Sequence, residues 1–396
     1  MRLKHELCRY LAKFPLFCTI LREFGFARGL PPVIAPGMNF TSDNWSGVHP
    51  VIAENLTRHA SGMARAYGQS ELDKRIEAKF SELFEREVAV FFVGTGTAAN
   101  SLALAAVNRP GGVAFCHSEA HIVKDECGAP EWFTGGSRLQ SVPGKAGKID
   151  PMKLVRELRK FRPDFIHAGQ PMAVSITQAT EVGTVYQPGE IDAISEICRS
   201  KGIPLHMDGA RFANALAGLG ISPAEMTWRR GVDVLSFGGT KNGCWCAEAM
   251  VFFDPTAAKD LPYIRKRAAQ LFSKTRFIAA QFEAYLEGEL WLELARSANA
   301  KAGSLSEILR ADPRCRLAWE TEANEVFVII DETLADEWIA KGLGCYKWPA
   351  PEDVVDSLAD NEIVLRLVTS FATGDGEVRR FAELVRDLPA GDSGSN

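Results

Sequence analysis

The sequence predicts an α/β protein with a mostly parallel central sheet in a large domain, followed by a small C-terminal α+β domain. Strand and helix patterns alternate over residues 71–254, which is typical of a parallel sheet built from βαβ units. The predicted strands are continuous apolar runs, as expected for a sheet that is covered on both faces. After residue 254 the pattern becomes mainly helical and then mixed. We therefore place the large domain at residues 38–285 and the small domain at residues 286–396.

The composition fits a globular enzyme and disfavours several other classes. The 396 residues are 46% hydrophobic and 24% charged, and the length suits two domains. A net charge of -5 gives no basic footprint for a nucleic acid or an anionic membrane. The chain has no apolar run long enough to predict a transmembrane helix. The nine cysteines lack metal-ligand spacing, so we expect reduced thiols, no metal site and a cytoplasmic protein.

The first 37 residues have a different character and end in a proline-rich linker. The apolar stretch over residues 14–21 is broken by Pro15 and lacks a small-residue cleavage site, so we expect no secretory signal. The acidic residues Glu6 and Glu23 argue against a transit peptide. Met38 is an alternative start. We treat residues 1–37 as an N-terminal extension and leave open whether it belongs to the native protein.

A phosphate-binding loop is predicted early in the large domain. The pattern indicates a helix over residues 71–86, a buried strand over 88–93 and a second helix over 101–107. The loop before the second helix contains Gly94, Thr95, Gly96 and Thr97. A helix N-terminus offers unpaired N–H groups and the positive end of the helix dipole, and glycines let the backbone approach an anion. Because the loop is neither GxGxxG nor a P-loop, it favours the phosphate monoester of a small cofactor over a nucleotide.

His121 and Asp125 are candidates for catalysis after the next strand, predicted over residues 112–116. They are four residues apart and would share one helix face. A lone histidine is more often structural. However, ligands of open α/β sheets bind at the carboxyl ends of strands, where this segment lies.

Asp208 and Lys241 end two successive strands, predicted over residues 203–208 and 232–237 and one βαβ unit apart, so they could face one cleft. Pyridoxal phosphate needs this pairing. A lysine holds its aldehyde as a Schiff base, and a carboxylate keeps its pyridine nitrogen protonated. With the phosphate-binding loop, the cofactor's three anchors are present. The alternative is an ordinary Gly-Thr-Lys loop and an N-cap aspartate followed by a solvated arginine, Arg211.

Arg366 is a charged residue inside an apolar strand of the small domain. An unpaired buried arginine is costly, so Arg366 must meet an anion. That anion is either an internal carboxylate or the α-carboxylate of an amino-acid substrate, and the cofactor interpretation favours the substrate. The elements predicted around it are helices over residues 261–287, 291–309, 332–340 and 376–388 and strands over 326–330 and 363–368. In the large domain, a strand-like pattern also covers residues 164–167.

The order of these motifs resembles the low-specificity L-threonine aldolases, a group of the fold type I (aspartate-aminotransferase-like) pyridoxal-phosphate enzymes and the beta-eliminating lyase/threonine aldolase group. The resemblance runs from about Met38 to the C-terminus. Each motif is weak singly, and the combination is specific. The motifs are Ser42-Asp43, residues 94–100, Ala120-His121, Asp208-Gly209-Ala210-Arg211, Thr240-Lys241 and Arg366-Leu367-Val368-Thr369.

The resemblance implies a role for each matching residue. Lys241 would be the Schiff-base lysine, Asp208 would pair with the pyridine nitrogen, and Arg211 would lie near the cofactor O3′. His121 would stack on the ring and, with Asp125, serve in catalysis. The implied cofactor-binding residues are Thr95, Gly96, Thr97, His121, Asp208, Arg211, Lys241 and Arg276. The implied substrate-binding residues are Ser42, Tyr67 and Arg366.

The resemblance also implies an assembly and a reaction. Tyr67 and Arg276 would reach in from a neighbouring subunit of a homodimer or homotetramer. The expected reaction is retro-aldol cleavage of L-threonine, L-allo-threonine or phenylserine to glycine and an aldehyde. The alternatives are another pyridoxal-phosphate lyase or transaminase, and a fold relative that only binds. The loop at residues 178–183 lacks a histidine that many relatives carry, so the base for the β-hydroxyl is open between His121 and a water.

Overall fold

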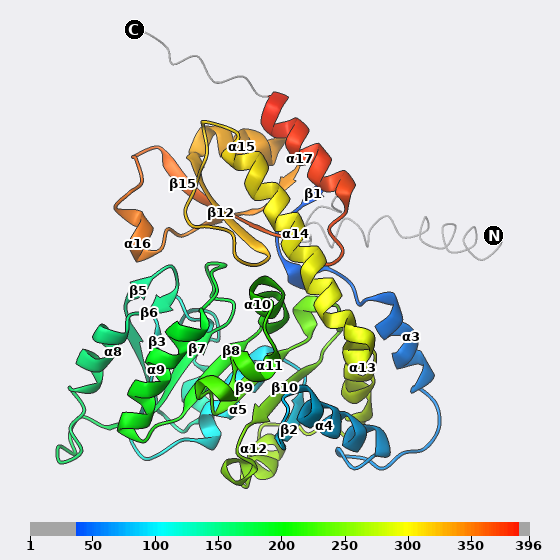
Figure 1. Ribbon diagram of the computed structural model, residues 1–396, viewed down its shortest axis with the longest axis vertical. Helices are drawn as coiled ribbons and strands as arrows, with labels where there is room; N and C mark the ends of the chain where they lie inside the picture. The colour runs from blue at the N-terminus through cyan, green and yellow to red at the C-terminus, as the bar shows by residue number, and fades with distance from the viewer. Residues whose placement is uncertain (1–36, 388–396) are drawn as a thin grey trace, which may run out of the picture. The chain divides into compact units, whose positions relative to one another are not determined.

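The computed structural model describes residues 37–387 (Figure 1), and our expectations for residues 1–36 and for the end of the predicted C-terminal helix lie outside that range. The central sheet confirms the predicted fold class. Its seven strands run in the order β2-β10-β9-β8-β7-β3-β4, and every neighbouring pair is parallel except the two that contain β10. The strands are β2 (Ala89–Val93), β3 (Gly112–His117), β4 (Arg138–Val142), β7 (Gln170–Thr177), β8 (Leu205–Gly209), β9 (Val234–Gly238) and β10 (Glu248–Phe252).

Several helices of this part of the chain begin with local capping contacts. For example, Ser70 and Asp73 form a reciprocal capping box at the start of α4, and Gly202 ends α9 in the left-handed conformation that favours glycine. The helices of this part of the chain are α3 (Pro50–Arg58), α4 (Glu71–Leu83), α5 (Gly96–Ala106), α6 (His121–Lys124), α7 (Ala129–Phe133), α8 (Pro151–Leu158), α9 (Pro188–Lys201), α10 (Phe212–Leu219), α11 (Pro223–Met226), α12 (Leu261–Arg267) and α13 (Arg276–Leu286).

Three predicted elements differ from the structure. Residues 164–167 form exposed turns and not a strand. The predicted helix over residues 261–287 is interrupted, because α12 ends at Arg267 and the backbone at Ala269 turns into the left-handed region (φ 59°). Helix α5 begins at Gly96, five residues before the predicted start at 101, because the Thr95 side chain caps it. Gly96 and Thr97 therefore belong to the first turn of the helix.

A second, antiparallel sheet forms in the C-terminal part, in the order β11-β12-β15-β14. Its strands are β11 (Arg316–Leu317), β12 (Glu325–Asp331), β14 (Tyr346–Trp348) and β15 (Glu362–Val368). Its helices are α15 (Glu332–Ala340), α16 (Glu352–Val355) and α17 (Asp375–Asp387). The long helix α14 (Leu290–Arg310) contacts α10 and α13 at one end and β12 and α17 at the other (Figure 1).

The first described residues, 38–40, pack with the C-terminal part of the chain. Strand β1 (Met38–Asn39) pairs in parallel with β13 (Leu343–Gly344), and Met38 and Phe40 belong to the same apolar core as Trp338 and Phe381. The division into domains at residues 38–285 and 286–396 stays a prediction. Within residues 37–387 no helix has the length and apolar character needed to cross a membrane.

An aromatic cluster supports the end of β9, just before Lys241. The ring of Phe237 lies 5.1 Å from that of Phe80 and 5.6 Å from that of Trp291, centroid to centroid, and all three side chains are buried. Asn242, next to Lys241, donates from Nδ2 to the Tyr285 hydroxyl and to the Trp291 carbonyl, both at 2.8 Å. The core therefore holds the loop that carries the lysine from both sides.

Candidate active site

A cavity of about 270 Å³ opens at the carboxyl ends of β2, β8 and β9. It brings together six of the predicted site residues, namely Thr95, Gly96, Thr97, His121, Asp208 and Lys241. The other residues that line it are Asn44, Gly94, Asn100, Glu126, Ala210, Thr240 and Glu248. We call this space the site cavity. Its position agrees with the rule that open α/β sheets bind ligands beyond the carboxyl ends of their strands.

The N-terminus of α5 forms one wall of the site cavity. Thr95 is the N-cap, and its Oγ1 accepts a hydrogen bond from the backbone N–H of Ala98 at 3.1 Å. A Cβ added at Gly96 would meet no atom within 4 Å, so the space beside the first turn is open. A Cβ at Gly94 would instead lie 2.8 Å from the Phe272 ring. The free N–H groups and the helix dipole of this turn suit a phosphate.

Asp208 is fixed at the end of β8 by two hydrogen bonds. It is buried, its Oδ2 accepts from Asn100 Nδ2 at 2.8 Å, and its Oδ1 accepts from the Ala210 backbone N–H at 3.0 Å. Asn100 Nδ2 also donates to Glu126 Oε1 at 2.9 Å. One amide therefore orients two carboxylates at the cavity wall.

His121 pairs with Glu126 and not with Asp125, which corrects the predicted partner. The Nδ1 atom of His121 lies 3.0 Å from Glu126 Oε1. Helix α6 has a single turn, so Asp125 is its C-cap and is exposed, whereas Glu126 is buried and lines the cavity. Burial opposes a charge on His121, but the hydrogen bond that its Nδ1 donates to Glu126 raises the pKa of the imidazole above its usual 6.5. Burial also raises the pKa of Glu126.

Lys241 lies in a one-turn helix, η3 (Thr240–Asn242), that follows β9. The loop packs too closely for side chains, because a Cβ at Gly238 would lie 2.6 Å from the Ala210 carbonyl oxygen and one at Gly239 would lie 2.7 Å from that of Ala247. Glu248 on β10 accepts from the Thr240 backbone N–H at 3.2 Å. Burial raises the pKa of Glu248 to about 7, although Lys241 and Thr240 oppose this.

Arg211, predicted near the cofactor O3′, is fully engaged by carboxylates and does not line the site cavity. Its Nε and Nη2 donate to Asp43 at 2.8 and 3.2 Å, and its Nη1 lies 3.1 Å from Glu325 Oε2. Burial opposes this charge, but Asp43 and Glu325 raise the pKa of Arg211. Burial would raise the pKa of Asp43, yet Arg211 and Lys241 hold it below its usual value.

Arg366 is buried on β15, and no hydrogen bond to its guanidinium occurs within residues 37–387. Its guanidinium carbon lies 4.0 Å from the ring centre of Trp348 and 5.5 Å from that of Tyr346. The internal carboxylate that we considered exists, since Glu325 Oε1 is 3.9 Å from Arg366 Nη1, but this distance is too long for a hydrogen bond. The donors of Arg366 are therefore available to another anion.

Ser42, Tyr67 and Arg276 do not line the site cavity of their own chain. Ser42 caps the one-turn helix η1 (Asp43–Trp45), which contacts η3. Tyr67 is 49% exposed and has an unusual positive φ of 59°. Arg276 donates to the Gly62 carbonyl and lines a separate cavity of about 400 Å³ with Arg58 and Arg65. The expectation that Tyr67 and Arg276 serve a neighbouring subunit stays a prediction.

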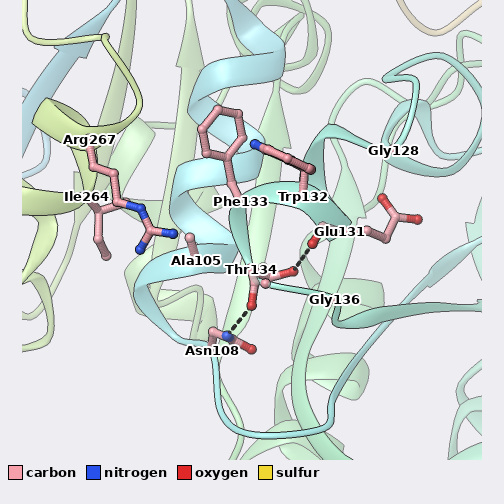
Figure 2. Close-up of a pocket in the computed structure, with 11 residues that line it drawn as sticks. Ala105, Asn108, Gly128, Glu131, Trp132, Phe133, Thr134, Gly136, Ile264 and Arg267 are labelled. Carbon is pink, nitrogen blue, oxygen red and sulfur yellow. Dashed lines mark hydrogen bonds between the residues drawn. The ribbon is translucent and has the colours of Figure 1, made fainter.

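A larger cavity of about 980 Å³ lies elsewhere, between α7 and α12. Figure 2 shows Ile264 and Arg267 on one side of it and Trp132 and Phe133 on the other. Its wall contains no lysine, histidine or aspartate, so it offers none of the chemistry that the sequence predicts. We therefore take the smaller site cavity as the candidate active site.

The site residues fit pyridoxal phosphate and do not fit a metal ion. Lys241 supplies an amine, Asp208 a fixed carboxylate, and α5 an open N-terminus, which are the three anchors of that cofactor. Among the described residues, no group of His, Cys, Asp or Glu side chains is arranged to hold a metal. Asn100, Glu126, Asp43 and Glu325 complete the surroundings and were not assigned from the sequence. Glu325 precedes the strand predicted over residues 326–330, so the argument used for Arg366 did not reach it.

The fold and this arrangement define a class, the fold type I pyridoxal-phosphate enzymes. A solved threonine aldolase from Leishmania major superposes with a TM-score of 0.81 at 29% identity, covering 88% of this chain and 98% of that chain. A tryptophan decarboxylase from Catharanthus roseus shares the fold with a TM-score of 0.69 at 15% identity, covering 97% of this chain and 96% of that one.

Sequence comparisons identify the family within this class. The family model for beta-eliminating lyases matches residues 39–333. Low-specificity L-threonine aldolases from Pseudomonas aeruginosa and from a Pseudomonas sp. are 42% and 45% identical to this chain, each aligned over 88% of this chain and 96% of the relative. The chain therefore belongs to the beta-eliminating lyase family, in its low-specificity L-threonine aldolase group.

Proposed function

We propose that this chain is a pyridoxal-phosphate L-threonine aldolase that cleaves L-threonine, L-allo-threonine and related β-hydroxy-α-amino acids to glycine and an aldehyde. The main support for the proposal is that Lys241, Asp208 and the N-terminus of α5 line one cavity. The names of the Pseudomonas and Leishmania relatives support the choice of reaction.

Different residues would hold different parts of the cofactor. Bound pyridoxal phosphate supplies an aldehyde for amines and a ring that accepts the electrons of a breaking Cα–Cβ bond. Thr95, Gly96 and Thr97 would hold the phosphate, and Asp208 would hold the ring nitrogen through an orientation set by Asn100. Lys241 would hold the aldehyde carbon until an amino acid replaces it.

His121 is the proposed base for the β-hydroxyl proton. Its Nδ1 is held by Glu126, so its Nε2 remains for a proton transfer in the site cavity. Arg366 would hold the substrate carboxylate, because its donors have no hydrogen bond in residues 37–387 and a bidentate carboxylate satisfies them. Ser42 would assist from the N-terminus of η1.

The test is product analysis on purified protein loaded with the cofactor. L-threonine should yield glycine and acetaldehyde in equal amounts. Formation of a keto acid and ammonia would move the reaction to an elimination or a transamination on the same cofactor. A colourless protein that takes up no cofactor would instead indicate a fold relative that only binds.

We further propose a cytoplasmic homodimer or homotetramer in which Tyr67 and Arg276 act on the neighbour's site. Both lie outside their own site cavity, which supports such sharing. Mixing inactive Lys241→Ala subunits with Arg276→Ala subunits should then restore about a quarter of the wild-type activity, because half of random dimers carry one intact site. Mixtures no more active than the separate variants would contradict shared sites.

A further inference from the structure

Five charged side chains gather next to the site cavity and form what we call the charged cluster. They are Asp43, Glu181, Arg211, Glu325 and Arg366, and all are buried. They come from η1, the loop after β7, the start of α10, β12 and β15. Three carboxylates thus face two guanidiniums, and each of the five contributes to the electrostatic environment of Arg366 or Glu325. In the described chain the cluster has more negative than positive members.

Glu325 is a buried member of the charged cluster whose carboxylate accepts no hydrogen bond from the described residues. It is 1% exposed, and neither carboxylate oxygen has a hydrogen bond within residues 37–387. Arg211 Nη1 lies 3.1 Å from Oε2, and Arg366 Nη1 lies 3.9 Å from Oε1. The loop after β7 covers it closely, since a Cβ added at Gly183 would come within 3.0 Å of Glu325 Cβ. A carboxylate that is shielded from solvent and accepts no hydrogen bond is costly to keep charged.

The surroundings of Glu325 favour its protonated form. Burial raises its pKa to about 7, opposed by Arg211 and Arg366 and reinforced by Asp43 and Glu181. Arg211 comes from the start of α10, Asp43 from η1, Glu181 from the loop after β7, and Arg366 from the neighbouring strand β15. Arg366 is one of the two positive charges that favour the ionised form of Glu325.

The two arginines differ in what they can still bind. Arg211 is held by both oxygens of Asp43. Arg366 has aromatic rings beside it and no hydrogen bond, and its Nε is buried without a partner in the described chain. An incoming carboxylate on Arg366 would add a fourth negative charge beside two positive ones and would draw Arg366 away from Glu325. Adding one proton to Glu325 offsets the added charge and restores the charge balance that the cluster had before the carboxylate bound.

We infer that Glu325 takes up a proton from solvent when the carboxylate of an amino acid binds Arg366, so that substrate binding depends on pH through a positioning residue that does not touch the substrate. The inference rests on the proposed role of Arg366. At pH 7 Glu325 begins about half ionised, so each site takes up at most about half a proton. Well above pH 7 the uptake approaches one proton, and the apparent affinity falls by up to about tenfold per pH unit.

The first test is calorimetric titration of the holoenzyme with glycine at pH 7, in phosphate and in Tris, whose ionisation enthalpies differ. The wild type should take up about half a proton more than Glu325→Gln. Glycinamide, which lacks the carboxylate, should show no such difference between the two proteins. The matched control is Glu77→Gln on α4, where burial also raises a carboxyl pKa to about 7, and it should behave as the wild type. Equal proton numbers in the wild type and Glu325→Gln would overturn the inference.

The second test is the pH dependence of KM for L-threonine between pH 6 and 9. The wild-type KM should rise steeply above pH 7 relative to that of Glu325→Gln, while the kcat ratio of the two stays constant. Glu325→Met, neutral and similar in length, replaces the glutamine variant if that one does not fold. A protein with Glu325-dependent proton uptake but no cleavage of threonine would refute only the proposed function. Cleavage with parallel KM profiles would refute only the inference.

Discussion

The site cavity and the charged cluster lie next to each other but are built in opposite ways. In the site cavity, Asp208 has a hydrogen bond on each oxygen, and Asn100 links it to Glu126. In the charged cluster, Glu325 and Arg366 have none within the described chain. The cavity is thus prepared for a resident cofactor, whereas the cluster keeps donors free for a substrate that must come and go.

Replacing the lysine should have the largest effect. Lys241→Ala is expected to lower turnover of L-threonine by at least about 10³-fold and to abolish the visible absorbance of lysine-bound cofactor, because the amine that holds the aldehyde is lost. Steady-state assays and absorbance spectra measure both. Circular dichroism should report an unchanged fold, and activity near that of the wild type would contradict the assignment of the lysine.

The two buried arginines should respond differently to the same substitution. Arg366→Met is expected to raise KM for L-threonine by about 10²-fold with little loss of stability, because it removes a substrate contact. Arg211→Met should lower the free energy of unfolding by about 3–5 kcal/mol, because Asp43 and Glu325 are left buried without their cation. KM is measured by steady-state kinetics and the free energy of unfolding by denaturant titration, for both variants. If the two substitutions changed KM and the free energy of unfolding to similar extents, the expected difference between the two arginines would be contradicted.

Removing the charge on Glu126 should move the pH profile. As a base, His121 must be neutral, so activity falls as pH drops through its folded pKa, which Glu126 raises above 6.5. In Glu126→Gln the acidic limb of kcat/KM should shift to lower pH, with a rate loss of about tenfold. Asp125→Asn is the matched control and should leave the limb in place, because Asp125 is exposed. An unshifted limb in Glu126→Gln would exclude His121 as the group that titrates.

Glu248 should give the smallest effect, on stability. Its pKa rises from 4.5 to about 7 on folding, so between these values the folded chain binds more protons than the unfolded chain and stability decreases as pH rises. This group alone should make the wild type about 1 kcal/mol less stable at pH 8 than at pH 6. Glu248→Gln should lack this contribution in urea unfolding, and identical pH trends in both proteins would refute it.

The site cavity could be predicted further than the charged cluster because its residues follow strand ends. Thr95, Asp208 and Lys241 each come just after an apolar run, and parallel strands bring such positions to one edge. His121 was found in the same way, but its partner was not, because the single turn of α6 could not be foreseen from residue spacing.

The charged cluster depends on contacts between distant segments. Asp43 accepts hydrogen bonds from Arg211 and Asn324, which are 168 and 281 residues away in the sequence. No local sequence pattern predicts such pairs. Arg366 was recognised only because a charge in an apolar strand needs a partner. The residue that lies beside it, Glu325, became visible when the strands were paired.

The most direct test of the account is the stoichiometry of products from L-threonine with the cofactor-loaded protein. We expect one glycine and one acetaldehyde for each threonine consumed, and at least about 10³-fold slower formation of both by Lys241→Ala. Consumption of threonine to a keto acid and ammonia, or no aldehyde from either threonine or phenylserine, would contradict it.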